Sequence, residues 1–524
     1  MGLMLVLGGI ASGKSRLAEA LATASGRPVR YLATAHADDL EMPERIRRHR
    51  ARRPAPWETV EGDPLTALGE SGEATVLLES LGPWLARLMD EAGLLTDAAV
   101  EPLGNAGEEA AASVLERVRT LAFAAAARQA PTIVVAEESG LGTVPRGAGT
   151  RRYLDLAGRA AELLADAAEQ VLLVVAGRPL ELKAPLADHA PLRVHGDRLV
   201  PPGALDFAVN IHPARRPPHL TAALAAALEQ ETYPDEQPAR LALAERHRRP
   251  PEEVLPTNGA CEAFWLIAQA LKPRLAACVH PSFTEPEAAL RAVSCPVVHV
   301  LRRPDAWQLE PEAVPEQAEL VVLGNPNNPT GTLDAAETIA QLVRPGRILV
   351  VDESFIDFVP EERESVAARR DLLGLVVVRS LTKLWSLAGV RAGYLLGPTP
   401  LVARLEAGRQ PWSVNSLACA ALEACASDRE TPARVALETA TARAALYKRL
   451  RRISGVRVWP STANFLLLHV PDGPRALAEL ERLRIAVRPA ASFPGLTANH
   501  LRVAVRDAVG NERLALALAE AIAA

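Results

Sequence analysis

One short segment near the start of the chain limits the possible folds more than any other feature. The apolar run MLVLGG leads directly into GGIASGKS, residues 8–15, and the amphipathic stretch that follows reads SRLAEALATA. The segment fits the pattern G-x-x-x-x-G-K-[ST], in which glycine N–H groups and the start of a helix surround phosphate groups. This order predicts a β-strand, a phosphate-binding loop and an α-helix, and therefore a P-loop NTPase-like α/β fold with a parallel sheet.

The same loop predicts how a nucleoside triphosphate and its metal ion would be bound. We expect Lys14 to reach the β- and γ-phosphates of ATP or GTP, and Ser15 to ligate Mg²⁺. A carboxylate at the end of a neighbouring strand would help to hold the ion. Glu79, which ends the run ATVLLE, is the candidate, although it could be an ordinary strand-end carboxylate. The loop residues expected to contact the nucleotide are Gly8, Gly9, Ser12, Gly13, Lys14 and Ser15.

The length of the chain, 524 residues, is too great for a single core, and its patterning divides it in two. Short apolar runs alternate with amphipathic stretches up to about Lys183, as in a parallel sheet flanked by helices. Residues 184–204 are rich in proline, glycine and charge and lack periodicity, so we expect a linker there. The predicted domains are therefore residues 1–183 and residues 205–524.

Composition argues against several classes of protein. Hydrophobic residues make up 49% and charged residues 23% of the chain, and the formal net charge is −5. These values are typical of a soluble globular protein and not of a nucleic-acid-binding chain. No apolar stretch reaches the roughly 18 residues of a membrane span. The five cysteines are odd in number and lack metal-ligand spacing, which favours reduced thiols and a cytoplasmic location. We expect small-molecule substrates, no nucleic-acid partner and no membrane span.

The run RIRRHRARRP, residues 45–54, places one histidine among six arginines. Such a run can be a solvated helix face or a patch that contacts nucleic acid. In a helix, however, Arg45, Arg52 and Arg53 would share the face of His49. Neighbouring cations lower the pKa of a histidine and keep it neutral, as a nucleophile must be, and they can balance the charge of a phosphoryl group. We therefore favour a segment that handles a nucleotide.

The first half contains, in this order, the runs GGIASGKSRLAEAL, YLATAHADDLEMPERIRRHRARRPAPWETVE, LLES, EESGLGTVP and DLAGR. Together they resemble adenosylcobinamide kinase / adenosylcobinamide-phosphate guanylyltransferase over about residues 1–183. The resemblance implies phosphorylation of the aminopropanol hydroxyl of adenosylcobinamide, and then transfer of GMP from GTP through a guanylylated histidine. By its place in the motif that histidine is His49, with Arg45 near the nucleotide. The chain departs from the family pattern at Arg48, where a second histidine is common, and at Glu137, where asparagine is usual.

The second half contains, in order, the motifs NGACEA, NPNNPTG, VDESFIDF, SLTKLWSLAGVRAGYLL and RVAVR. Together they resemble the fold-type I pyridoxal-phosphate enzymes of the aspartate aminotransferase superfamily. The resemblance implies a pyridoxal 5′-phosphate cofactor. It also implies a homodimer in which Tyr233, in TYPDE, reaches a cofactor phosphate of the other subunit.

The resemblance assigns a role to individual residues of these motifs. Lys383 would bind the cofactor covalently and later move protons, and Asp352 would pair with the protonated pyridine nitrogen. Asn328 would hydrogen-bond the ring oxygen, and Phe283 would stack on the ring, although Phe283 and Tyr233 could be ordinary core aromatics. The groups expected at the cofactor phosphate are Ser380, Thr382, Arg391 and the backbone N–H groups of Ala260 and Cys261.

Further runs, RQPWSVNSLA, TANFLLL and SFPGLTANHLRVAVRDAVGNERL, resemble L-threonine O-3-phosphate decarboxylase over residues 205–524. Histidinol-phosphate aminotransferase is the closest alternative. Aminotransferases of that kind usually carry tyrosine at the position of Phe355, which has no hydroxyl. The resemblance implies that Arg502 binds the substrate carboxylate, that Arg488 binds its phosphate and that Asn210 touches the substrate.

Both resemblances concern the aminopropanol arm of cobalamin. We therefore expect a bifunctional enzyme of cobalamin biosynthesis whose second half converts L-threonine O-3-phosphate to (R)-1-aminopropan-2-ol O-2-phosphate. Three alternatives stay open. The second half could be an aminotransferase acting on a phosphorylated substrate, the first half could be a nucleotide-binding module of reduced activity, or the arginine-rich run could bind nucleic acid.

Overall fold

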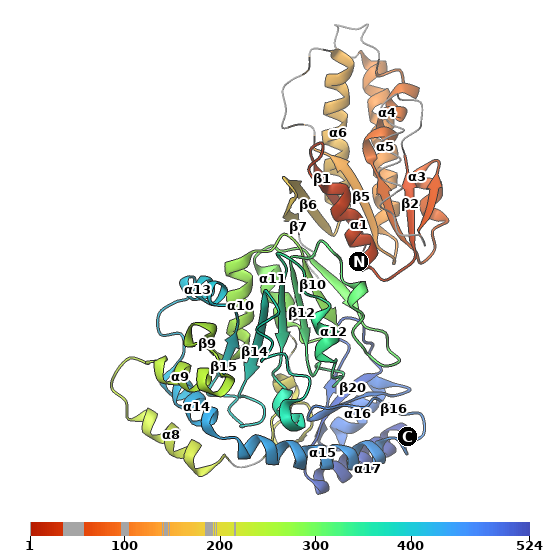
Figure 1. The fold of residues 1–524 in the computed structure, drawn as a ribbon. Coiled ribbons are helices and arrows are strands. Elements are labelled where there is room, and N and C mark those ends of the chain that lie inside the picture. The colour runs from red at the N-terminus through yellow and green to blue at the C-terminus, as the bar shows by residue number, and fades with distance from the viewer. Residues whose placement is uncertain are drawn as a thin grey trace. The chain divides into compact units, whose positions relative to one another are not determined.

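The computed structural model describes residues 2–34, 57–95, 104–138, 140, 145, 147–183, 192, 194, 196–213 and 216–523. The chain forms two compact units, one built on Met1–Ala187 and the other on most of the residues from Asp188 onward (Figure 1). All five cysteines are free thiols. Among the helices in the described ranges, none is both long and apolar enough to cross a membrane.

The first unit is built on a seven-stranded sheet of order β3-β2-β4-β5-β1-β6-β7 within the described residues. The apolar runs MLVLGG, VRYLATA, ATVLLES, TIVVAEE and QVLLVVAG contain the strands β1, β2, β4, β5 and β6, which pair in parallel, as predicted. The strands are β1 Leu3–Gly8, β2 Val29–Ala33, β3 Glu58–Glu61, β4 Thr75–Glu79, β5 Thr132–Glu137, β6 Gln170–Val175 and β7 Arg178–Lys183.

The edge strand β7 is not among these five apolar runs, and it pairs antiparallel with β6. The cause is the two-residue connection between them. Ala176 and Gly177 both adopt positive φ values, 50° and 72°. This conformation produces the tight turn of a β-hairpin, so the chain returns alongside β6 instead of crossing over the sheet.

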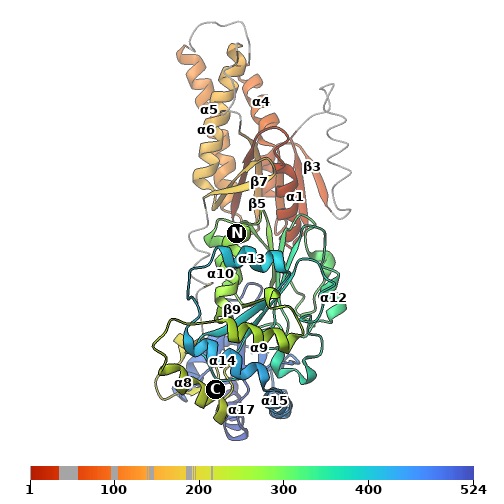
Figure 2. The same cartoon turned by 60° about the vertical axis from the view of Figure 1, so that its left-hand side comes forward.

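Helices cover both faces of this sheet because the segments between the strands are amphipathic. They are α1 Lys14–Ala24, α3 Pro64–Gly69, α4 Leu81–Glu91, α5 Asn105–Ala126 and α6 Ala148–Ala167. The long helices α5 and α6 lie side by side (Figure 2). Fully buried side chains from the sheet and from α3, α4, α5 and α6, such as Leu5, Leu85, Leu121 and Leu164, form one continuous apolar core.

The large sheet of the second unit has the order β11-β10-β12-β13-β14-β15-β9 within the described residues. The strands β10, β12, β13 and β14 run parallel, whereas β15 is antiparallel to both of its neighbours. The strands are β9 Val254–Asn258, β10 Ala276–His280, β11 Val297–Leu301, β12 Leu320–Gly324, β13 Ile348–Asp352, β14 Leu375–Ser380 and β15 Ala392–Leu396. Since β9 is reversed twice relative to β14, its carboxyl end lies at the same sheet edge as those of β12, β13 and β14.

Helices surround the large sheet (Figure 1). They are α8 Pro218–Leu228, α9 Gln237–His247, α10 Gly259–Leu271, α11 Glu285–Ala292, α12 Ala336–Ala340, α13 Thr399–Ala407 and α14 Ser416–Ser427. The long helix α15, Glu430–Leu450, then leads into a smaller subdomain at the carboxyl end of the chain.

The smaller subdomain is a four-stranded antiparallel sheet, β16-β17-β20-β19, packed against helices. Its elements are β16 Arg457–Val458, β17 Phe465–His469, α16 Gly473–Arg482, β19 Arg488–Pro489, β20 His500–Ala504 and α17 Ala508–Ala523. The short strands β8 Leu205–Asp206 and β18 Ile485–Ala486 pair beside it.

Part of the segment that we predicted as linker belongs to this second unit. The Thr284 hydroxyl donates a hydrogen bond to the Leu192 carbonyl at 2.6 Å, and the Arg488 guanidinium donates one to the Val194 carbonyl at 2.6 Å. A short 3₁₀ helix follows at Gly196–Leu199.

Candidate nucleotide and cofactor sites

The glycine loop of the first unit connects β1 to α1, as its sequence predicts. Gly13 has a φ of 95° and Ala11 a φ of 57°, so the loop needs two left-handed residues. A Cβ at Gly8 would lie 2.5 Å from Ser12 Oγ, so only glycine fits there. The Ser12 hydroxyl is buried and has no hydrogen-bond partner in the described part of the chain. The loop is therefore closely folded and offers at least one free donor.

Lys14 and two strand-end glutamates lie at the same end of this sheet. Lys14 is buried; its Nζ donates to the Gly9 carbonyl at 3.4 Å and lies 4.0 Å from a Glu137 oxygen. Glu79 is buried at the end of β4, and β5, which ends at Glu137, pairs with both β4 and β1. The two carboxylates therefore lie at the strand ends next to the loop, where they would balance the charge of a cation bound to phosphates.

In the sequence, Glu137 stands out only as a departure from a family pattern. The structure shows that Glu137 contacts the loop lysine and that its Oε2 is buried without a hydrogen bond in the described ranges. Burial and the Glu137 carboxylate raise the pKa of the neighbouring Tyr153 to about 12. The signal was present, because the run TIVVAEE ends in a carboxylate just as ATVLLE does. The predicted nucleotide residues Arg45 and His49 lie outside the described residues.

The cofactor motifs of the second unit converge at the carboxyl edge of its large sheet. Asp352 ends β13, and Ser380 ends the neighbouring strand β14. The NPNNPTG turn with Asn328 follows β12, and Gly259 starts α10 directly after β9. Lys383 lies three residues beyond Ser380. The parallel strands therefore bring residues from four distant segments to one place.

Lys383 and Asp352 have the electrostatic properties that an amine nucleophile and a ring-pairing carboxylate need. Burial, followed by the charge of Arg502, lowers the pKa of Lys383, which favours the neutral, nucleophilic amine. Burial raises the pKa of Asp352, whereas hydrogen bonds from the Ser354 N–H and hydroxyl oppose this shift. Both of these bonds reach Oδ1, at 3.0 and 2.5 Å, and no hydrogen bond to Oδ2 is found among residues 216–523. The second oxygen is therefore available to a cationic N–H.

The residues predicted to bind the cofactor phosphate fit such a group. Gly259 has a φ of 73°, and a Cβ there would lie 2.9 Å from Arg391 Cζ and overlap one of its nitrogens. The backbone of Gly259 and Ala260 and the Arg391 guanidinium thus lie within one narrow space at the start of α10. Ser380 and Thr382, about ten residues before Arg391 in the sequence, have buried hydroxyls that hydrogen-bond to each other. Helix-start N–H groups, two hydroxyls and an arginine are the donors that suit a phosphate monoester.

Arg502 holds together the residues predicted to contact the substrate. Its guanidinium donates to Asn328 Oδ1 at 2.6 Å and to the Ala208 carbonyl at 2.7 Å. With its amide oxygen turned to Arg502, Asn210 accepts hydrogen bonds at 3.0 and 3.3 Å. Burial and the charge of Arg488 lower the pKa of Arg502 to about 9. The charge of this buried cation contributes to the lowered pKa of Lys383.

Arg488 is also buried, and burial lowers its pKa to about 10. Its guanidinium donates to Ser492 Oγ at 2.7 Å and to the Val194 carbonyl and lies 5.1 Å from the Phe493 ring. Carbonyl and hydroxyl acceptors leave its positive charge uncompensated. A buried arginine of this kind is suited to an anionic substrate group.

Three aromatic residues of the cofactor motifs differ in how far they are buried. Phe355 is buried, and Lys383 Nζ lies 6.0 Å from its ring centre, so an apolar ring stands where a tyrosine hydroxyl would be. Phe283 is half-buried. Tyr233 is 74% exposed and stacks on Trp412, with ring centres 4.5 Å apart. The exposure of Tyr233 separates it from the buried cluster around Lys383 within this one chain.

This fold, with its buried lysine, carboxylate and phosphate-type cradle at one sheet edge, defines a fold-type I pyridoxal-phosphate-dependent enzyme. Residues 209–522 match the family model of aminotransferase class I and II, which covers more than half of the chain, and the chain belongs to that family. Residues 4–182 match the model for cobinamide kinase / cobinamide phosphate guanyltransferase. The chain therefore joins a domain of each kind.

The relatives of the second unit include proteins of two different functions. A histidinol-phosphate aminotransferase of Mycobacterium tuberculosis is 44% identical over 328 residues, 61% of this chain and 89% of that protein. A threonine-phosphate decarboxylase of Salmonella typhimurium is 36% identical over 334 residues, 61% of this chain and 91% of that protein. The crystal structure of L-threonine-O-3-phosphate decarboxylase from Porphyromonas gingivalis matches with a TM-score of 0.55 and 26% identity, covering 60% of this chain and 98% of that one.

Proposed function

We propose that this chain is a bifunctional enzyme of cobalamin biosynthesis. The second unit would decarboxylate L-threonine O-3-phosphate to (R)-1-aminopropan-2-ol O-2-phosphate. The first would phosphorylate adenosylcobinamide and transfer GMP from GTP to the product. The observation that carries the proposal is the joining of the two domains in one chain. A kinase for a molecule with an aminopropanol arm and an enzyme that makes aminopropanol phosphate serve one pathway.

The residues around Lys383 support binding of a phosphorylated amino acid. Arg502, with Asn210 beside it, would hold the substrate carboxylate, and Arg488 would hold its phosphate. Two buried cations at fixed positions orient a substrate that carries an anion at each end. Pyridoxal phosphate, held by the Arg391 cradle and Asp352, would supply the electron sink. The lowered pKa of Lys383 allows its amine to deliver a proton to the substrate and to take one back.

The second candidate activity is transamination, because the Mycobacterium tuberculosis relative, a histidinol-phosphate aminotransferase, is 44% identical. The apolar Phe355 beside Lys383 favours decarboxylation, since the tyrosine usual in such aminotransferases is missing. A single-turnover experiment separates the two. An aminotransferase mixed with histidinol phosphate and no keto acid loses the visible absorbance of its cofactor in proportion to enzyme. We expect the absorbance to persist and L-threonine O-3-phosphate to be consumed over many turnovers without a keto acid.

In the first unit, the loop around Lys14 and the carboxylates of Glu79 and Glu137 support binding of a nucleoside triphosphate with Mg²⁺. His49 would accept GMP. Incubation of the full chain with GTP labelled in the α-phosphate should mark the wild type covalently and leave His49→Ala unmarked. Equal labelling of both would refute the assignment of His49. A wild type that binds GTP but is never labelled would support a nucleotide-binding module without transferase activity.

A further inference from the structure

The second unit contains a cavity of about 470 Å³ between the end of α9, the loop after β13 and the start of α15. We call it the α9–α15 pocket. Its volume lies in the range of small-molecule sites. Its charged lining residues are Arg246, Arg248, Asp357, Glu361, Glu362 and Arg429, and alanines of α15 and residues 367–368 provide apolar wall.

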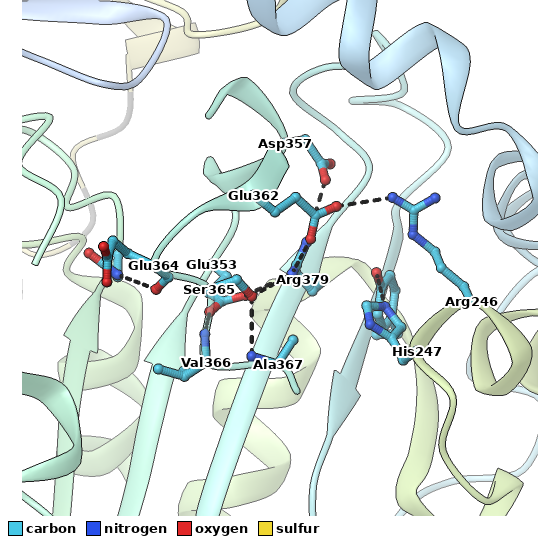
Figure 3. A network of polar contacts seen from close by, with 12 residues as sticks. Arg246, His247, Glu353, Asp357, Glu362, Glu364, Ser365, Val366, Ala367 and Arg379 are labelled. Carbon is cyan, nitrogen blue, oxygen red and sulfur yellow. Dashed lines mark hydrogen bonds and ion pairs between the residues drawn. The ribbon is translucent and has the colours of Figure 1, made fainter. Parts of the chain in front are cut away.

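The pocket is distinct from the cofactor site because none of its lining residues is among those predicted to bind the cofactor. Arg379 precedes Ser380 on β14, and successive side chains of a strand point to opposite faces. The Arg379 guanidinium turns toward the pocket wall, where it contacts Glu362 at 2.8 Å and Asp357 at 3.4 Å (Figure 3). Ser380, on the other face, belongs to the predicted phosphate cradle.

The three arginines of the pocket differ in how many hydrogen bonds and ion pairs they form. The Arg246 guanidinium is already paired, since it lies 3.1 Å from Glu362 (Figure 3). It also donates hydrogen bonds to two carbonyls. Arg429 donates one hydrogen bond, to the Arg246 carbonyl at 2.8 Å. The exposed Arg248 guanidinium makes no hydrogen bond or ion pair within residues 216–523. The pocket therefore holds two arginines with free donors.

The pocket has free negative charge as well. Glu361 is exposed and has no ion pair in the same part of the chain. Asp357 is half-buried and shares the Arg379 guanidinium with Glu353 and Glu362, so three carboxylates face one arginine. The pocket thus combines two arginines that have free donors with one carboxylate, Glu361, that is unpaired within these residues and one, Asp357, that shares its arginine with two others.

The backbone around the pocket is held in an unusual conformation. Glu361, Glu362 and Glu364 have positive φ values of 60°, 48° and 65°. Arg248, with a φ of 51°, is the left-handed residue at which α9 ends. A left-handed conformation costs about 1–2 kcal/mol for each residue other than glycine. Such residues cluster at ligand-binding sites, where the strain positions side chains for a partner.

We propose that the α9–α15 pocket is a second ligand site that takes a compact zwitterion. The acidic group of the ligand, a carboxylate or phosphate, binds Arg248 and Arg429. Its cationic nitrogen lies against Glu361 and Asp357, and its aliphatic part contacts the alanines at the start of α15. The site needs no cofactor and is independent of which reaction the second unit catalyses.

Calorimetric titration of the full chain, loaded with pyridoxal phosphate, tests this proposal with phosphocholine as the probe. The quaternary nitrogen of phosphocholine cannot condense with the cofactor, so the heat reports binding alone. The variants are the pair Arg248→Gln/Arg429→Gln and the single change Glu361→Gln. Arg434→Gln is the matched control, because Arg434 lies on α15 outside the pocket, where it pairs with Glu438.

We expect one saturable site per chain in the wild type and in Arg434→Gln. The double variant should bind at least about 10-fold more weakly, because charge-assisted hydrogen bonds are lost. Glu361→Gln should bind phosphocholine about 2- to 5-fold more weakly and inorganic phosphate as well as the wild type does. Absence of saturable binding to the wild type, or equal affinity in all variants, overturns the proposal. So does binding that is lost in Arg488→Gln and kept in the double variant, since the probe would then occupy the substrate site.

Discussion

Replacement of Gly259 by alanine should weaken cofactor binding in a way that the structure lets us estimate. The new Cβ would lie 2.9 Å from Arg391 Cζ and overlap a guanidinium nitrogen, so the arginine must move away from the start of α10. Charge-assisted hydrogen bonds contribute about 1.5–3 kcal/mol each. Loss of one to the cofactor phosphate should therefore raise the Kd for pyridoxal phosphate by about 10- to 150-fold.

Gly346→Ala is the matched control for this change. Gly346 has a φ of 77°, close to the 73° of Gly259, but a Cβ there would meet nothing within 4 Å. Both variants bear the same backbone strain of about 1–2 kcal/mol, and only Gly259→Ala disturbs Arg391. Titration of the apoenzyme with pyridoxal phosphate, followed by absorbance, measures the two affinities. Equal affinities in the two variants would refute the assignment of Arg391 to the cofactor phosphate.

Three further predictions concern other parts of the chain. Gly8→Ala would place a methyl group 2.5 Å from Ser12 Oγ, so GTP affinity in equilibrium dialysis should fall at least about 10-fold; an unchanged Kd would argue against a phosphate-binding loop. Arg502→Lys keeps the charge but loses the planar fork, so the KM for L-threonine O-3-phosphate should rise about 10-fold while cofactor affinity is kept, and an unchanged KM would count against substrate binding there. Burial lowers the pKa of His247 from 6.5 to about 3, so the unfolded chain binds a proton that the native chain does not, and the free energy of unfolding falls as the pH drops from 6.5 towards 3. At pH 5 the free energy of unfolding should be about 2 kcal/mol lower, as measured by urea titrations followed by circular dichroism of the bound cofactor. His247→Gln should remove this loss, and an equal loss in the variant would contradict the reasoning.

Local sequence patterns predicted much of the fold because the strands are short apolar runs that end in recognisable residues. The strands β1 and β5 follow from MLVLGG and TIVVAEE. The approach of Asp352 to Lys383 also follows, since the carboxyl ends of parallel strands lie at one edge of the sheet. In these cases the relevant geometry is set within a few residues or by strand direction alone.

The features that the sequence did not predict depend on contacts between distant segments. The link between Lys14 and Glu137 arises from the pairing of β1 with β5, more than a hundred positions apart. The α9–α15 pocket combines three segments, 246–248, 357–368 and 429–436, none of which carries a motif. The antiparallel β7 depended on the left-handed conformation of Ala176, which alanine rarely adopts, so Gly177 was the only glycine at this two-residue turn.

The central claim is that Lys383 serves decarboxylation of a phosphorylated amino acid in a chain that also carries a cobinamide kinase-type domain. The most direct test supplies the purified full chain with pyridoxal phosphate and L-threonine O-3-phosphate labelled at the carboxyl carbon, without a keto acid, and measures released CO₂. We predict many equivalents of labelled CO₂ per chain, an equal amount of aminopropanol phosphate, and none from Lys383→Ala. Retention of the label in the amino acid, together with keto-acid-dependent turnover of histidinol phosphate, would contradict the account.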